Sequence, residues 1–73
     1  MELRMVEVFK TNVRYKRQAK QLLTVLSERF PSFHINFDLD DCDKILRVEG
    51  DHVRQEEIAR LVTGNGYQCV TLD

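Results

Sequence analysis

The fold is decided by the stretch FHINFDLDDCDKILRVE at residues 33–49. In its first part, apolar residues occupy alternate positions with polar residues between them, at Phe33, Ile35, Phe37 and Leu39. This period of two is typical of a strand that has one buried face and one solvent face. The sequence therefore predicts a sheet that is covered on one side only.

The rest of this stretch predicts a hairpin. Asp40–Asp43 supplies side chains that hydrogen-bond to their own backbone in turns. After this turn, Leu46 and Val48 alternate with Arg47 and Glu49, which gives a second strand with the same period. Because the connection is so short, we expect the two strands to pair antiparallel.

Another strand is predicted before the hairpin, from Leu3 to Lys10. Here Val6 and Val8 alternate with Glu7 and Phe9, which is again the pattern of a half-buried strand.

A long helix is predicted to follow that strand, over Val13–Phe30. Thr11 and Asn12 have side-chain oxygens that can cap the free N–H groups at a helix start. Pro31 ends the helix, because the residue before a proline is disfavoured in the helical conformation. Apolar residues at spacings of three and four form one stripe, at Ala19, Leu22, Leu23, Leu26 and Phe30.

A second helix is predicted after the hairpin, opened by Gly50 and Asp51 and continuing to about Thr63. Glu56 and Glu57 lie early in it, where the helix dipole favours negative charge.

The end of this second helix is predicted at Gly64–Gly66, because glycine and asparagine accept the left-handed conformation in which helices stop. A last strand then covers Tyr67–Leu72. The order βαββαβ predicts an α+β, ferredoxin-like sandwich whose four-stranded antiparallel sheet has the strand order 4-1-3-2 and two helices on one face. With 73 residues, the chain has room for one core, so residues 1–73 are expected to form a single domain.

In this layout three connections share one end of the molecule. They are the segments Thr11–Arg14, Asp40–Asp43 and Gly64–Gly66. We expect any binding site to lie at this end, which we call the loop end.

The whole chain resembles the heavy-metal-associated domains of copper chaperones and metal-transporting ATPases. The likeness lies in the layout, in the Val-x-Val of the first strand, in the acidic hairpin, and in Gly66-Tyr67 before the last strand. In that family a Cys-x-x-Cys at the start of the first helix binds a soft metal ion. The matching residues here are Asn12 to Tyr15, so the resemblance implies the fold but not the thiolate metal site.

Composition argues against several classes of function. The net charge of −1 lacks the surplus of Lys and Arg that nucleic-acid binding requires. No apolar run reaches the ~18 to 20 residues of a membrane span, and the first four residues lack the apolar stretch of a signal peptide. We therefore expect a cytoplasmic protein without nucleic-acid or membrane partners. Cys42 and Cys69 are too few for a disulfide framework and are expected to be free thiols.

The sequence gives no pattern for a cofactor or a catalytic centre. Carboxylates from Asp38 to Glu49 partly follow a calcium-loop spacing, but Asp43 stands where that loop needs glycine. Cys42 and Cys69 alone are an incomplete zinc site. His34 and His52 have no nucleophile or carboxylate at a catalytic spacing. We expect a non-enzymatic domain with no cofactor and no bound metal ion.

Charge is distributed unevenly along the chain. Residues 1–37 hold seven basic and three acidic residues, a net +4, whereas residues 38–73 hold four and nine, a net −5. One interpretation is a solvated surface, and the other is a docking face for a protein partner or a second copy of the chain. The candidate partner-binding residues at the loop end are Lys10, Asn12, Arg14, Tyr15, Arg17, Asp40, Asp41 and Cys42.

The leading prediction is thus a binding or interaction domain on a heavy-metal-associated-like scaffold. The alternative is a metal-binding protein or metallochaperone that uses Cys42 and nearby loop residues.

Overall fold

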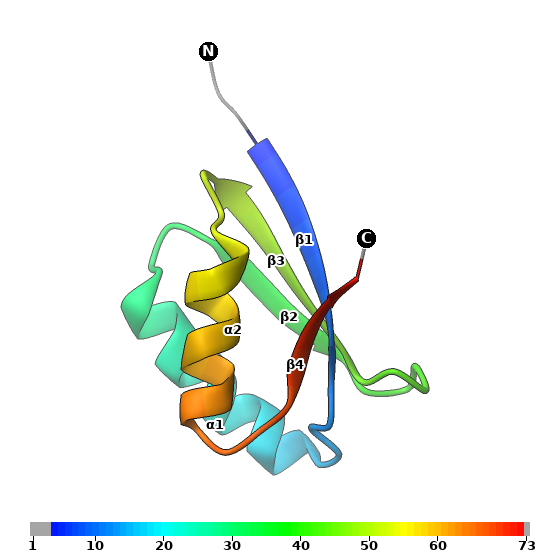
Figure 1. Cartoon of the computed structure of the whole chain (residues 1–73). Coiled ribbons are helices and arrows are strands. Elements are labelled where there is room, and N and C mark those ends of the chain that lie inside the picture. Colours follow the sequence, from blue (N-terminus) through cyan, green and yellow to red (C-terminus); the bar gives the residue numbers. More distant parts are fainter. Residues whose placement is uncertain (1–3, 73) are drawn as a thin grey trace.

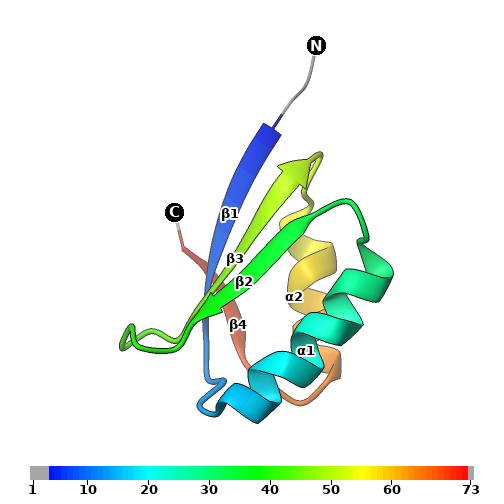
Figure 2. The same cartoon turned by 180° about the vertical axis from the view of Figure 1, so that it is seen from behind.

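The structure, a computed structural model, describes residues 4–72 and consists of a four-stranded sheet with two helices (Figure 1). The elements in chain order are β1 (Arg4–Thr11), α1 (Lys16–Arg29), β2 (His34–Asp38), β3 (Ile45–Asp51), α2 (Gln55–Gly64) and β4 (Cys69–Leu72). Both helices lie against the same face of the sheet, which leaves the other face open, as the view from behind also shows (Figure 2). None of the helices in the described part of the chain is long and apolar enough to span a membrane.

The strands are arranged in the order β2-β3-β1-β4, and all neighbouring pairs are antiparallel. This is the expected order 4-1-3-2 read from the other edge. The two strands at the centre of the sheet, β1 and β3, pair along seven residues from Arg4–Asp51 to Lys10–Ile45. The sheet therefore has two edges, β2 and β4.

The core lies between the sheet and the helices. Its largest fully buried side chains include Phe9 from β1, Leu22 and Leu26 from α1, Leu46 from β3 and Ile58 from α2. The predicted apolar stripe of the first helix is thus confirmed where it meets the sheet.

Because successive residues of β1 point to opposite faces of the sheet, its apolar residues are divided between the helix side and the open side. Phe9 is fully buried on the helix side, while Val6, on the other face, is 53% exposed. The predicted half-buried strand is present, but its buried face is the one that carries Glu7 and Phe9, not the one that carries Val6 and Val8.

The start of α1 differs from the prediction. Thr11 and Asn12 do not cap the helix: Thr11 is the last residue of β1, and the helix begins at Lys16. The backbone N–H groups of Arg14 and Tyr15 donate to Oε1 of Gln18 at 3.2 and 3.3 Å. The side chain of Gln18, in the first turn of α1, thus caps the helix by accepting hydrogen bonds from N–H groups that precede it.

The start of α2 was also predicted too early. Gly50 and Asp51 are the last residues of β3, and α2 begins at Gln55. Gly50 is needed in the strand because its α-carbon lies under the ring of Phe33, and an added Cβ would overlap that ring. The side-chain amide of Gln55 donates to Glu7 of β1 at 2.7 Å, which fixes the helix start against the sheet.

The second helix ends where glycine predicts. It stops at Gly64, and Gly66 has a φ of +95°, which side-chain-bearing residues rarely adopt. Glu56 and Glu57 do lie in its first turn. The last strand is shorter than expected, because Tyr67 and Gln68 still belong to the connection and β4 starts at Cys69.

Candidate functional site

The three connections of the loop end are tied to one another. The N–H of Thr11 donates to the carbonyl of Asp43 at 3.1 Å, and its hydroxyl donates to the carbonyl of Lys44 at 2.6 Å. The N–H of Gln68 donates to Oδ1 of Asn12 at 2.8 Å. The three connections therefore share one end of the molecule, as the sequence predicts, and the β1–α1 connection contacts both of the others.

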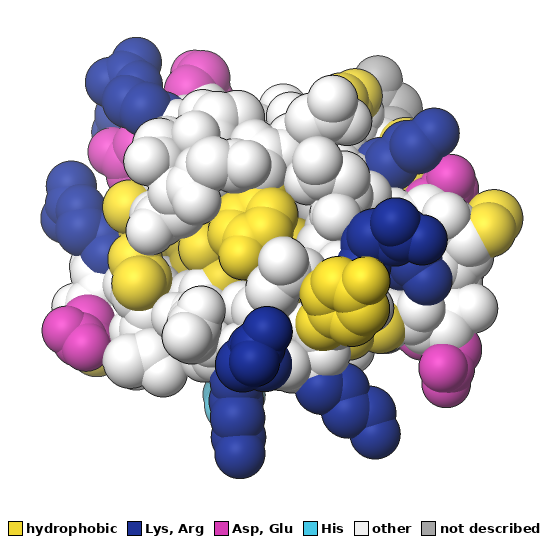
Figure 3. All heavy atoms as spheres, turned by 90° about the horizontal axis from the view of Figure 1, so that it is seen from below, with side chains coloured by type: hydrophobic (Ala, Val, Ile, Leu, Met, Phe, Trp, Pro, Cys, Tyr) yellow, Lys and Arg dark blue, Asp and Glu magenta, His cyan; other side chains and the backbone are white. Residues whose placement is uncertain are grey.

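The structure separates the predicted partner-binding residues into those with structural contacts and those that face solvent. The side chain of Asn12 holds the α2–β4 connection. Lys10 Nζ lies 3.6 Å from a carboxylate oxygen of Asp43. In contrast, Arg14, Arg17 and the 58% exposed Tyr15 present their side chains at the surface. Figure 3 views this end of the molecule and shows apolar side chains exposed among Lys and Arg side chains.

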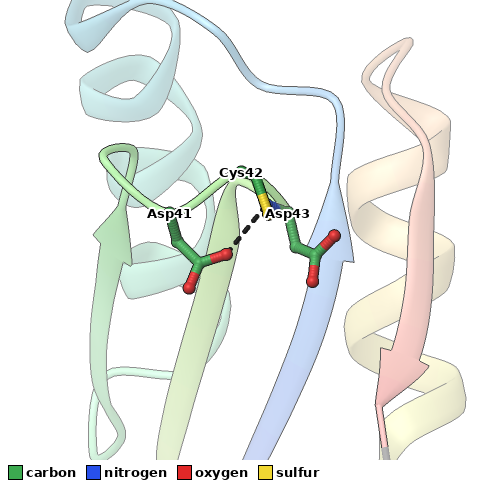
Figure 4. Close-up of side chains that lie close together, drawn as sticks. All are labelled: Asp41, Cys42 and Asp43. Atoms are coloured by element: carbon green, nitrogen blue, oxygen red, sulfur yellow. Dashed lines mark hydrogen bonds between the residues drawn. The ribbon is translucent and has the colours of Figure 1, made fainter.

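The tip of the β2–β3 hairpin brings Asp41, Cys42 and Asp43 together (Figure 4). Their ligand atoms lie within 4.8 Å of one another, and they are the one such group of three in residues 4–72. The N–H of Asp43 donates to Oδ1 of Asp41 at 2.8 Å, and the Asp43 carboxylate faces Lys10. Both carboxylates thus already have structural partners, which is the arrangement of a turn that caps itself.

The second cysteine is a poor metal ligand in this fold. Burial raises the pKa of the Cys69 thiol to about 11. Formation of the thiolate, which metal binding requires, is therefore less favourable at Cys69 than at an exposed cysteine. Cys42 and Cys69 are both free, and no disulfide joins them.

One hollow in the described surface was not predicted. It is a groove of about 820 Å³ between α1 and β2, which reaches the loop end. Its apolar part consists of Ala19, Leu23, Phe37 and Leu39, and its charged and polar part of Lys16, Arg17, Lys20, Gln21, Asn36, Asp38 and Asp40. We call it the α1–β2 groove. Of the predicted partner-binding residues, it includes Arg17 and Asp40.

The groove exists because β2 is an edge strand that α1 covers incompletely. Phe37 and Leu39 point to the helix side of the sheet, yet they are only partly buried. The residue of the neighbouring strand β3 that pairs with Phe37, Leu46, is fully buried. The alternating pattern of residues 33–39 identifies the apolar face but cannot show how far a helix covers it, so the groove was missed.

The helix wall of the groove carries a cluster of basic side chains. Lys16 and Arg17 are the first residues of α1, and Lys20 follows one turn later. Within residues 4–72 none of the three forms an ion pair. Cations in the first turn of a helix are opposed by its dipole, at a cost of roughly 0.3–1 kcal/mol each. These residues therefore do not stabilise the fold through any contact that the structure shows.

Acidic residues lie at the loop end of the strand wall, and the pleat of β2 directs the Asp38 side chain to the open face, away from that of Phe37. Asp38 accepts a hydrogen bond from the N–H of Asp40 at 3.2 Å, so one of these carboxylates is occupied locally. No ion pair joins this wall to the basic cluster across the groove in the described residues.

A comparison with known proteins gives no relative for this chain: no family model matches it, and no curated protein or solved structure matches it significantly.

Proposed function

We propose that the chain is a small non-enzymatic interaction domain that binds a protein partner in the α1–β2 groove and at the adjoining loop end. The observation that supports this most directly is the basic cluster of Lys16, Arg17 and Lys20, which forms no ion pair with any residue in the described part of the chain and borders partly exposed apolar side chains. Exposed apolar surface bordered by charge is typical of interaction sites. The proposal includes a ferredoxin-like scaffold of the heavy-metal-associated type that lacks the thiolate pair.

An interaction domain fits the loop end better than an enzyme does. Catalysis needs polar groups that converge on one point and are free to act. Here the Thr11 hydroxyl and the Asn12 amide oxygen are used to hold the connections together. The proposed domain needs no cofactor. It would act in the cytoplasm, where Cys42 and Cys69 remain reduced.

The proposal is tested by capture of partners from cell extract with matched charge variants. Wild type is compared with Lys16→Glu/Lys20→Glu, which reverses the groove cluster, and with Arg60→Glu, which reverses an exposed cation on α2. We expect at least one protein to be retained by wild type and Arg60→Glu but lost from the double variant. Identical capture by all three chains would refute an interaction site in the groove.

A second candidate function is metal binding at the hairpin tip, and the grouping of Asp41, Cys42 and Asp43 is the observation that favours it. Such a metallochaperone would use the Cys42 thiolate with carboxylate oxygens, an unusual set for a soft ion. Titration of reduced protein with Zn²⁺ or Cu⁺ decides between the two. Stoichiometric uptake that is abolished in Cys42→Ser would favour the metal carrier over the interaction domain.

A further inference from the structure

The α1–β2 groove runs beside an unpaired strand edge. β2 pairs with β3 on one side only, through the register from His34–Glu49 to Asp38–Ile45. In an antiparallel strand, the N–H and C=O groups of alternate residues point away from the paired neighbour. The edge of β2 therefore offers main-chain donors and acceptors next to the partly buried side chains of Phe37 and Leu39.

We propose that the occupant of the groove is an extended segment of a partner protein that adds to the sheet as a fifth strand along β2. Its side chains toward α1 would be apolar in the middle of the groove and carboxylates near the loop end. This inference rests on the proposed function and specifies the chemistry of the partner. Strand addition of this kind takes affinity from main-chain hydrogen bonds and specificity from alternate side chains.

The apolar requirement follows from the floor of the groove. An added strand places every second side chain on the helix side of the sheet. There it would meet Leu23 from α1, Phe37 from β2 and Leu39 just after β2, all of which are only partly buried. Covering their exposed surface is favourable for an apolar side chain.

The acidic requirement follows from charge complementarity. Side chains on the helix side near the loop end would face Lys16, Arg17 and Lys20. Side chains of the alternate set would lie beside Asp38 on the open face, where a carboxylate is repelled. The carboxylates of the occupant are therefore expected at every second position and on one face only.

A second copy of the chain fits this edge less well. Pairing of β2 with β2 of a second molecule about a two-fold axis normal to the sheet would bring two α1 helices to the same side of the joined sheet. Each α1 contains four basic residues and one acidic residue, a net +3. Two such helices repel each other across the junction, whereas an acidic segment neutralises one of them.

The test uses the full chain and the synthetic peptide Val-Thr-Ile-Thr-Glu-Thr-Glu with blocked ends, together with its reversed sequence. The first order places its carboxylates at the loop end if the peptide runs parallel to β2, and the reversed order does so if the peptide runs antiparallel. We expect one order to bind, with amide NMR shifts along β2 and the first half of α1. Lys20→Glu should weaken this binding about fivefold, and Arg60→Glu should leave it unchanged.

N-methylation of the peptide then separates strand addition from binding through side chains alone. One set of alternate N–H groups faces β2 in an added strand, and the other set faces solvent. Methylating the inner set should weaken binding at least about tenfold, whereas methylating the outer set should change it less than about twofold.

The outcomes separate the two proposals. Equal effects of both methylated sets would overturn strand addition while leaving the groove as a binding site. If neither peptide order binds while partner capture still depends on Lys16 and Lys20, the assigned partner chemistry is wrong and the proposed function stands. A dimer in sedimentation with protected β2 amides would assign the edge to a second copy and overturn the inference.

Discussion

Gly50 shows how one residue fixes the contact between the sheet and the chain that leads into β2. Its missing side chain lets the ring of Phe33 lie on the backbone of β3, and that ring stacks on Phe30 with a centroid distance of 5.2 Å. The aromatic pair thereby closes the end of the core opposite the loop end, where α1 gives way to β2.

Replacing this glycine should destabilise the fold. Gly50→Ala forces the Phe33 ring away from its site and should lower the free energy of unfolding by about 1–3 kcal/mol. Gly64→Ala is the matched control, because nothing lies within 4 Å of the added methyl group and alanine favours the helix. Urea unfolding of both variants measures the effect. Equal midpoints for the two variants would mean that the Phe33 ring moves aside without cost.

The two thiols should differ in reactivity. Cys42 is exposed at the hairpin tip, whereas burial raises the pKa of Cys69 to about 11. With a disulfide reagent at pH 8, we expect one fast thiol, which is lost in Cys42→Ser, and one slow thiol. Comparable rates for both would show that β4 opens readily.

The same thiol gives a dependence of stability on pH. The folded chain holds the Cys69 proton to about pH 11, whereas the unfolded chain releases it near the usual value of 9.0. The contribution is therefore complete below pH 9 and is lost as the pH rises from about 9 to about 11. Cys69→Ala should remove this loss, which denaturant melts at pH 8, 9.5 and 11 would measure. A variant that loses as much stability as wild type over this range would contradict the assignment to Cys69.

At the level of elements, β1 is joined to the hairpin by a side chain as well as by the sheet. The buried Thr11 hydroxyl donates to the carbonyl of Lys44 and accepts from the N–H of Val13 at 3.2 Å. Thr11→Val keeps the shape but leaves both groups without a partner, so the free energy of unfolding should fall by about 1–3 kcal/mol.

The control for this variant is Thr24→Val, which removes an exposed hydroxyl that bonds within α1. We expect its stability to change by less than about 0.5 kcal/mol. Hydrogen exchange of the Val13 amide gives a second measurement, because it should accelerate in Thr11→Val only. An unchanged exchange rate would mean that this amide does not depend on the threonine.

The types and the order of the elements could be predicted from the sequence, because the apolar residues that recur with helical or strand spacing form the buried faces of those elements. Both helix starts were predicted too early for a physical reason. Thr11 and Asn12 have the chemistry of helix caps, but the same oxygens can bond to distant connections of the chain, and here they bond to Lys44 and Gln68. Gly50 likewise looks like a turn residue, although an aromatic ring from elsewhere in the chain requires it in a strand. The local sequence pattern cannot distinguish a helix cap from a long-range hydrogen bond, or a turn glycine from a strand glycine that contacts a ring.

The candidate site was predictable only in part for a related reason. Clustering of charge near residues 10–20 is visible in the sequence, and Arg17 and Asp40 do border the groove. The predicted strand order already places β2 at a sheet edge, but the groove also depends on how far α1 covers that edge, which the pattern does not show. Phe37 therefore has the sequence pattern of a core residue but forms the floor of a groove.

Over the whole molecule, the two helices differ in the sign of the charge in their first turns. Glu56 and Glu57 occupy the first turn of α2, where they complement the dipole, whereas Lys16 and Arg17 occupy the first turn of α1, where they oppose it. The dipole alone would favour acidic residues in the first turn of both helices. The unfavourable charge on α1 is therefore consistent with binding of an external acidic partner.

This interpretation predicts that stability and binding change in opposite directions. Lys16→Glu should raise the free energy of unfolding by about 0.5–1 kcal/mol, a few degrees in melting temperature, because it replaces an opposed charge with a favoured one. The same variant should retain less of the partner captured through the groove. Glu56→Lys is the mirror control, expected to lower stability without affecting capture. Because the dipole effect weakens as salt is added, the stability gain of Lys16→Glu should shrink in 1 M salt. A Lys16→Glu chain that is less stable than wild type would show that Lys16 stabilises the fold itself, and the argument for an external partner would then lose its energetic basis.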